Sequence, residues 1–116
     1  MSLSGKKILI LVENGYQDLE FWYPKIRLTE EGAEVVVGGK DKAAYQSEHG
    51  YPVAADISVA QADPKKFDVV VIPGGVACPD RLRRYGEVLN FVKEMSQQGK
   101  VVASICHGPW VLISSG

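Results

Sequence analysis

The sequence has few of the residues that mark a secreted, metal-binding or membrane-spanning protein. It contains two cysteines, Cys78 and Cys106, and two histidines, His49 and His107, so it offers neither a disulfide framework nor a paired zinc-ligand pattern. We therefore expect no metal and no organic cofactor. No apolar run approaches the roughly 18 residues that span a bilayer, and the first residues lack the apolar core of a signal peptide. These features predict a cytoplasmic protein that does not bind a membrane.

The chain also lacks an excess of charge of either sign. Its 116 residues include 13 basic and 14 acidic side chains, for a formal net charge of -1. A protein that holds a phosphate backbone usually carries a basic excess, so nucleic acid is not an expected partner. The length and the 46% of apolar residues suit one compact domain, residues 1–116.

Short apolar runs separated by helical patterns dominate the sequence. The runs span residues 6–12, 34–39, 67–73 and 100–105. Their near-continuous apolar character is typical of strands covered on both faces, and their alternation with helices predicts an α/β fold with a mostly parallel central sheet. Between them, residues 51–59 favour a short strand pair at an edge, and residues 62–68 favour a helical turn or loop.

A helix is predicted between the first two strands. Asp18 suits the N-cap position and Gly32 suits the C-terminal stop. Pro24 favours a regular helix that begins only near Tyr23, which would leave Glu20 in an irregular entry segment.

Two further helical patterns follow in the second half of the chain. Residues 79–100 have an apolar face with a predicted break at Gly86. The last pattern begins after residue 105 and ends at Gly116, with little sequence left for its apolar face to pack against. We therefore expect the C-terminal part of the domain to be missing from this chain.

Cys106 carries the strongest chemical signal. It follows a buried strand and opens a helix in the sequence SICHGP, so it should lie at a sharp turn that exposes its side chain. A thiol at a helix N-terminus is close to backbone N–H groups that favour the thiolate and lower its pKa. The alternative is a small buried hydrophobe at the end of a strand. His107 comes next but need not reach Cys106 as a base, and Cys78 and His49 are expected to be a structural cysteine and a surface loop residue.

Other candidate residues fall at the same edge of the predicted sheet. Gly74 and Gly75 follow the third apolar run, and paired glycines let backbone N–H groups approach a ligand or a developing oxyanion. Ligand sites in open α/β sheets lie at the carboxyl ends of the strands. The segment after the first strand, the Gly74 loop and the Cys106 turn therefore converge on one predicted site. Asp18 and Asp80 both precede helical patterns, where capping would explain them.

These motifs resemble those of the PfpI intracellular protease family, within the class I glutamine amidotransferase-like superfamily that also holds glyoxalase and deglycase enzymes. The motifs are ASICHGP around Cys106, IPGG at 72–75, PDRLR at 79–83, DLEFWYP at 18–24, EEGAEV at 30–35 and HGYPV at 49–53. The resemblance implies a flavodoxin-like three-layer sandwich, of which this chain would be the N-terminal two thirds.

The resemblance also implies roles for individual residues. Cys106 matches the nucleophile, Glu20 matches the carboxylate that hydrogen-bonds its sulfur, and His107 matches the histidine after the nucleophile. In that family the acidic partner of the histidine comes from a neighbouring subunit, and Asp80 occupies the corresponding position. A homo-oligomer, dimeric or larger, is therefore implied.

The resemblance leaves three functions open. It assigns backbone contacts to an oxyanion to Gly74, Gly75 and the amide of His107. The first function is a cysteine hydrolase acting on peptides, a protease or amidase. The second is a glyoxalase or deglycase acting on methylglyoxal or glycated adducts. The third is a non-enzymatic sensor of oxidative stress or a chaperone. Asp80 and the Gly-Gly loop favour an enzyme over the sensor, but no residue separates peptide from small-aldehyde substrates.

Overall fold

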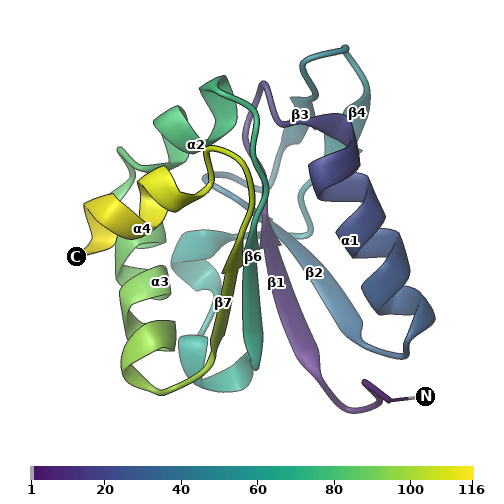
Figure 1. Ribbon diagram of the computed structural model, residues 1–116, viewed down its shortest axis with the longest axis vertical. Helices are drawn as coiled ribbons and strands as arrows, with labels where there is room; N and C mark the ends of the chain where they lie inside the picture. The colour runs from purple at the N-terminus through teal and green to yellow at the C-terminus, as the bar shows by residue number, and fades with distance from the viewer. Residues whose placement is uncertain (1) are drawn as a thin grey trace.

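A five-stranded parallel sheet forms the centre of the computed structural model, which describes residues 2–116 (Figure 1). The strand order is β5-β2-β1-β6-β7. The sheet strands are β1 (Lys7–Leu11), β2 (Glu34–Gly39), β5 (Ile57–Ser58), β6 (Val69–Ile72) and β7 (Val101–Ser104). The remaining elements are α1 (Asp18–Glu30), β3 (Ala44–Gln46), β4 (Pro52–Ala54), the 3-10 turns η1 (Val59–Gln61) and η2 (Pro64–Lys66), α2 (Ala77–Leu82), α3 (Gly86–Gln97) and α4 (Pro109–Ser115). The predicted α/β fold is confirmed.

The apolar runs at 6–12, 34–39 and 67–73 form the three inner strands of the sheet. The run at 100–105 forms β7 at the edge, where Val101 is 59% exposed, so the expectation that this run is covered on both faces is wrong. β1 pairs in parallel with β2 on one side and with β6 on the other. Leu9, Ile10 and Leu11 have no exposed surface. Side chains on alternate positions of a strand point to opposite faces, so an unbroken apolar run is what this central position requires.

Helices cover the two faces of the sheet and give three layers (Figure 1). α1 lies on one face, with Phe21 fully buried. α2, α3 and α4 lie on the other face, where α3 buries Val88, Phe91, Val92 and Met95 at helical spacing. No helix among residues 2–116 is long and apolar enough to cross a bilayer.

The start of α1 differs from the sequence expectation. The helix begins at Asp18 rather than near Tyr23, so Glu20 lies in its first turn. The N-cap is Gln17 rather than Asp18, because the Gln17 side-chain oxygen accepts a hydrogen bond from the Glu20 amide at 3.0 Å. Pro24 is tolerated inside the helix, where it removes one backbone donor without ending the helix.

The segment between β2 and β6 also differs in part. β4 pairs antiparallel with β3, while β5 joins the main sheet beside β2, so residues 51–59 do not form a strand pair of their own. The helical turn expected in residues 62–68 is present as η2. The amide of Glu48, in the loop between β3 and β4, donates to the carbonyl of Tyr16 at 2.9 Å. This bond places the β3–β4 loop next to the entry of α1.

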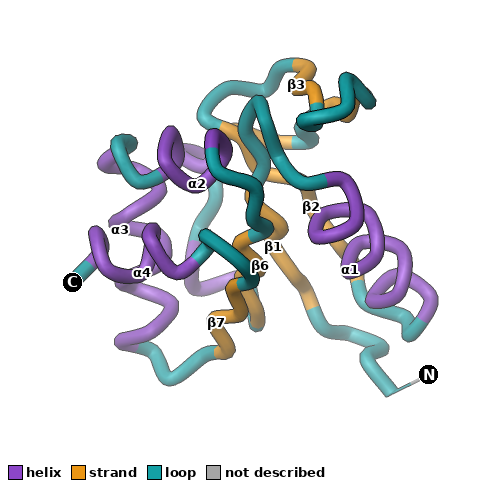
Figure 2. Tube along the Cα trace, turned by 45° about the horizontal axis from the view of Figure 1, so that its top comes forward, coloured by secondary structure: helices purple, strands orange, loops and turns teal. Residues whose placement is uncertain are grey.

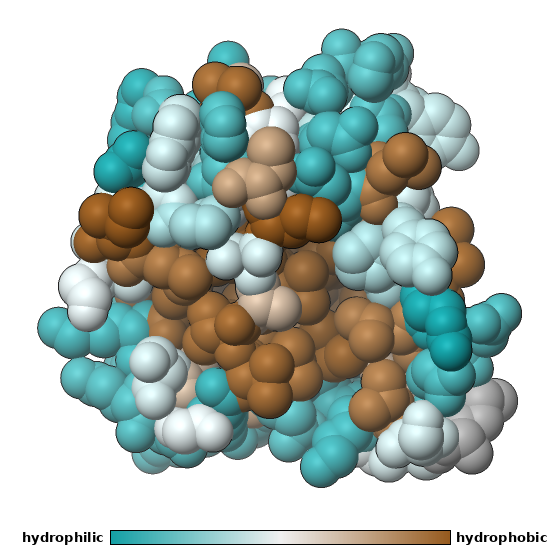
Figure 3. Space-filling view, in the orientation of Figure 1, coloured by the Kyte–Doolittle hydropathy of each residue, from teal (hydrophilic) through white to brown (hydrophobic). Residues whose placement is uncertain are grey.

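Part of the sheet face on which α1 lies is left uncovered by the described residues. Figure 3 shows it as a broad hydrophobic area in the middle of the molecule, in the orientation of Figure 1. Val101 at the start of β7 is 59% exposed and Ile105 is 46% exposed. Two adjoining hollows on this face are both lined by Leu28, Val71 and Ala103.

Candidate active site

Cys106 lies in the tight turn that joins β7 to α4. It is the one non-glycine residue with a positive φ, 59°, among residues 2–116. Hydrogen bonds hold this turn: the amide of Ile105 donates to the carbonyl of Ile72 at 3.2 Å, and the amide of Gly108 donates to the carbonyl of Ile105 at 2.8 Å. A left-handed conformation at a side-chain-bearing residue is costly, and such residues cluster at functional sites. The thiol is exposed, as the elbow interpretation predicts, so the buried alternative is wrong.

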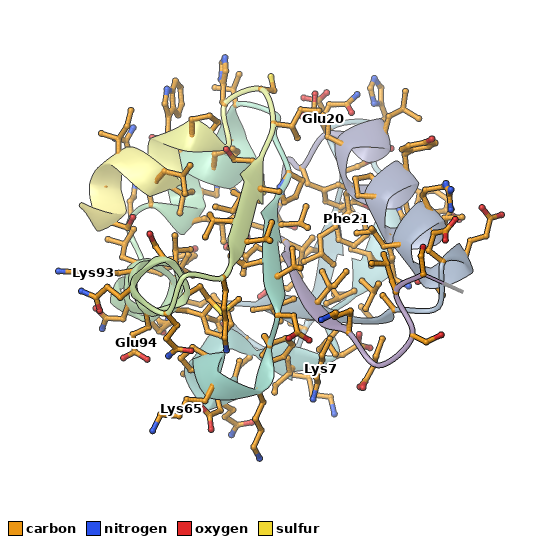
Figure 4. The ribbon with its side chains drawn as sticks, turned by 60° about the horizontal axis from the view of Figure 1, so that its bottom comes forward. Lys7, Glu20, Phe21, Lys65, Lys93 and Glu94 are labelled. Carbon is orange, nitrogen blue, oxygen red and sulfur yellow. The ribbon has the colours of Figure 1, made fainter. Side chains whose placement is uncertain are left out.

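The Glu20 carboxyl and Cys106 meet at Gly74, in the loop after β6. A Cβ built on Gly74 would overlap Glu20 Oε1 and would lie 2.6 Å from Cys106 Cβ. Residues from the first turn of α1 and from the end of β7 therefore flank the same Cα. Figure 2 shows the loops after β6 and β7 at the edge of the sheet where α1 begins, and Figure 4 shows Glu20 at that end of α1.

The Glu20 carboxyl has an oxygen without a partner. Its Oε1 is buried and makes no hydrogen bond to another residue in the described range 2–116. A buried oxygen of this kind normally has a donor, because an unsatisfied polar atom loses its hydration without compensation. The carboxyl is therefore placed to bond with a thiol or a ligand that approaches Cys106.

Backbone amides at the same place are free to donate. Gly75 has a φ of 86°, and a Cβ on it would lie 2.5 Å from the Gly15 carbonyl oxygen, so only glycine fits. Within residues 2–116, neither the Gly75 amide nor the His107 amide donates a hydrogen bond to another residue. Free amides beside an exposed nucleophile are the donors that an oxyanion requires.

His107 and Asp80 are not brought together in this chain. The His107 imidazole stacks on the Trp110 indole, with ring centroids 4.5 Å apart. Its Nδ1 is buried and has no partner among the described residues. Asp80 lies inside α2, where its Oδ2 accepts a hydrogen bond from Arg84 at 2.6 Å. Asp80 therefore pairs with a residue just beyond the end of its own helix and does not cap that helix.

Cys78 lies outside this site. It is fully buried in α2, and burial raises the pKa of its thiol. Close to it, the buried Glu13 accepts a hydrogen bond from the Tyr85 hydroxyl at 2.7 Å. Burial, followed by this bond to Glu13, raises the pKa of Tyr85 to about 12. A buried thiol that stays protonated is a poor nucleophile, so Cys78 fits the expected structural role.

The structure shows an interaction between Asp18 and His49 that the sequence did not predict. His49 Nδ1 lies 2.8 Å from Asp18 Oδ1 and joins the β3–β4 loop to the first turn of α1. The hydrogen bond to Asp18 raises the pKa of His49. Partial burial acts to raise the pKa of Asp18, but bonds with His49 and Ser47 outweigh it and lower that pKa. The expectation of an exposed His49 is correct, but the partner lies 31 positions away, beyond any local pattern.

No group of three or more His, Cys, Asp or Glu side chains in residues 2–116 is arranged to hold a metal ion. The chemistry that the described residues offer is that of an exposed thiol, a buried carboxyl oxygen, an imidazole and free backbone amides.

Comparison with known proteins gives consistent matches over almost the whole chain. A model of the DJ-1/PfpI family matches residues 6–116. A deglycase of Pyrococcus horikoshii is 42% identical over 110 residues, which are 95% of this chain and 66% of the relative. The deglycase PfpI of Pyrococcus furiosus is 43% identical over the same shares of the two chains. The chain thus spans just under two thirds of the length of these relatives.

Solved structures of similar proteins share the fold. A two-domain protein of Anabaena variabilis, with a DJ-1/ThiJ/PfpI-like and a ferritin-like domain, is 43% identical and superimposes with a TM-score of 0.91. The match covers 95% of this chain and 33% of that one. Drosophila melanogaster DJ-1beta is 30% identical with a TM-score of 0.91, over 98% of this chain and 61% of the other.

Proposed function

Because the chain belongs to the DJ-1/PfpI family, we propose that it carries the thiol site of a cysteine hydrolase that removes small carbonyl adducts, a deglycase or glyoxalase. The observation that carries this proposal is the meeting of the Glu20 carboxyl and the exposed Cys106 at Gly74. The deglycase names of the two Pyrococcus relatives support the choice of substrate class.

In the proposed reaction the Cys106 thiolate adds to the aldehyde carbon of methylglyoxal, or displaces the amine or thiol from its glycation adduct. The product is a hemithioacetal on the enzyme. Glu20 or His107 takes the proton from that carbon, and a proton is returned to the neighbouring carbonyl carbon through an enediol. The aldehyde carbon becomes a thioester and the ketone becomes an alcohol, so oxidation and reduction balance inside the substrate. Water then cleaves the thioester, releasing lactate and the thiol.

Peptide hydrolysis is the less favoured alternative. It requires an oriented acid to protonate the leaving amine, whereas the Nδ1 of His107 has no orienting carboxylate in the described part of this chain. We propose that a second copy of the chain supplies that carboxylate through Asp80, whose side chain is 39% exposed. Proton transfer beside a carbonyl needs one well-placed base, which the Glu20 carboxyl supplies.

The test is lactate release from methylglyoxal adducts of N-acetylcysteine and N-acetyllysine by the purified chain. We expect Cys106→Ser to abolish release, because a hydroxyl is a far weaker nucleophile than a thiolate. Cys78→Ser is the matched control and should retain the activity, since Cys78 is fully buried and is not among the atoms that meet at Gly74. A fluorogenic peptide panel assayed in parallel distinguishes a peptidase from a deglycase.

Two results would overturn the proposal. Lactate release that is equal in wild type and Cys106→Ser would remove the thiol from the mechanism. Cleavage of peptides without any release from the adducts would replace the deglycase by the peptidase.

A further inference from the structure

Trp110 makes contacts that core packing does not explain. It lies in the first turn of α4 and is only partly buried. It is absent from the set of side chains that form or pack against the hydrophobic core, whereas the other tryptophan, Trp22, is among them. A half-buried indole away from the core needs another reason for its place.

The neighbours of the Trp110 ring are a histidine and an arginine. The His107 ring stacks on it with centroids 4.5 Å apart and planes 27° from parallel. The guanidinium of Arg83, the C-cap residue of α2, lies 5.5 Å from the same ring centroid, within the range of a cation–π contact. Arg83 is held in turn, because its Nε donates to Ser114 Oγ at 2.9 Å.

We propose that Trp110 is the positioning residue for His107, holding the imidazole by stacking in the orientation from which it exchanges protons at the Cys106 site. This inference rests on the proposed function, in which His107 is one of the two proton carriers. Stacking fixes the plane of the imidazole while leaving its edge free, so Trp110 provides orientation without occupying either ring nitrogen.

The position of the ring nitrogens supports this role. His107 Nδ1 is buried and unpartnered among residues 2–116, so no hydrogen bond from this chain orients the ring through that atom. Among residues 2–116, the stack with Trp110 is a contact that restrains the ring without using this nitrogen. The backbone adds a short tether, because the Trp110 amide donates to the His107 carbonyl at 3.0 Å.

Arg83 sets the electrostatic environment of the stack. Its charge lies beside the indole of Trp110. Cys106 precedes His107 in the sequence, and the Glu20 carboxyl of α1 approaches Cys106 at Gly74. An indole face attracts a cation, so it stabilises imidazolium as well as the guanidinium.

The kinetic test compares Trp110→Leu with Trp110→Phe in the lactate assay. We expect Trp110→Leu to lower kcat by about tenfold or more with little change in KM, because the acid–base step loses its oriented imidazole. Trp110→Phe keeps an aromatic face and should recover most of kcat. The rate of Cys106 alkylation should stay within about twofold in both variants, since the thiol and Glu20 are untouched. Equal kcat in all three proteins would overturn the proposal.

A second readout does not depend on activity. In a Trp22→Phe background Trp110 is the remaining tryptophan, because the sequence contains two. Imidazolium in contact with indole quenches its fluorescence, so emission should fall when the pH is lowered far enough to protonate His107. His107→Asn should remove this pH dependence, and His49→Gln should retain it.

The two readouts separate failure of this inference from failure of the proposed function. If wild type releases no lactate while the quenching depends on His107, the substrate class is wrong and the stack stands. If lactate is released but emission is independent of pH, or changes equally in His107→Asn, Trp110 does not position His107.

Discussion

Gly74 is the residue on which the geometry of the site most directly depends. The atoms nearest to its missing Cβ belong to Glu20, Cys106 and Ile105. A side chain there would force apart the carboxyl and the nucleophile. The absence of one methyl group therefore allows residues from α1 and from the β7–α4 turn to approach each other.

We expect Gly74→Ala to slow lactate release at least tenfold, because displacement of reacting groups by even about 1 Å is costly. Cys106 should be alkylated at a different rate, since Glu20 would be pushed away from it. The control is Gly86→Ala, because a Cβ at Gly86 meets no atom within 4 Å. Circular dichroism melting of both variants checks the fold, and wild-type kinetics in a folded Gly74→Ala protein would contradict the proposed contact.

At the scale of elements, the Asp18–His49 pair joins the β3–β4 loop to the helix that carries Glu20. The folded pKa of His49 is raised, so its contribution to stability is complete below the unfolded value near 6.5 and is lost as the pH rises through the folded value. The folded pKa of Asp18 is lowered, so its contribution is present above about 3.9 and is lost as the pH falls through the folded value. The pair stabilises the protein most between these limits.

We therefore expect the urea midpoint to fall between pH 6 and pH 8 in wild type by more than in His49→Gln. The decrease should be modest, because His49 is largely exposed and solvent screens the pair. Asp18→Asn should remove the same pH dependence. Urea unfolding curves at pH 5, 6, 7 and 8 measure the effect, and identical pH dependence in wild type and both variants would show that the pair does not form in solution.

At the scale of the whole molecule, the described chain brings together part of the Cys106 site and leaves an apolar area of the sheet uncovered. Three strand ends converge on Cys106, Glu20 and the Gly74 loop. The His107 Nδ1 lacks a carboxylate among residues 2–116, and the apolar face around Val101 is uncovered by them. The unpartnered Nδ1 agrees with the proposal that Asp80 of a second copy acts on His107, whereas the uncovered apolar face lies on the α1 side of the sheet, away from α2.

That proposal predicts complementation between two variants. Cys106→Ser alone should be inactive and Asp80→Asn alone should be slow, whereas unfolding and refolding them as an equimolar mixture should restore activity. A randomly mixed dimer would regain up to about a quarter of the native sites, because each heterodimer holds one intact Cys106–Asp80 pair.

Arg84→Gln is the control, since Arg84 is the partner of Asp80 within its own chain. It should leave activity unchanged if Asp80 acts on another copy. Mixtures no more active than their components, or a chain that is monomeric by light scattering yet fully active, would contradict the shared site.

Much of the fold could be predicted from the amino-acid sequence alone. The apolar runs at 6–12, 34–39, 67–73 and 100–105 contain β1, β2, β6 and β7, and the elbow at Cys106 follows the last of them. These features depend on short-range properties of the chain, namely side-chain alternation, turn chemistry and helix periodicity. The resemblance to the family's motifs then indicated which residues are candidates for the site.

The remaining features depend on how elements pack against one another. Helix α1 starts at Asp18, before Pro24, because Gln17 caps it and Phe21 is buried against the sheet. The Asp18–His49 pair, the contact of Arg83 with Trp110, and the approach of Glu20 to Cys106 at Gly74 all join side chains of different elements or turns. Local sequence patterns carry no information on strand register or on the angle between a helix and the sheet, and those two quantities set these distances.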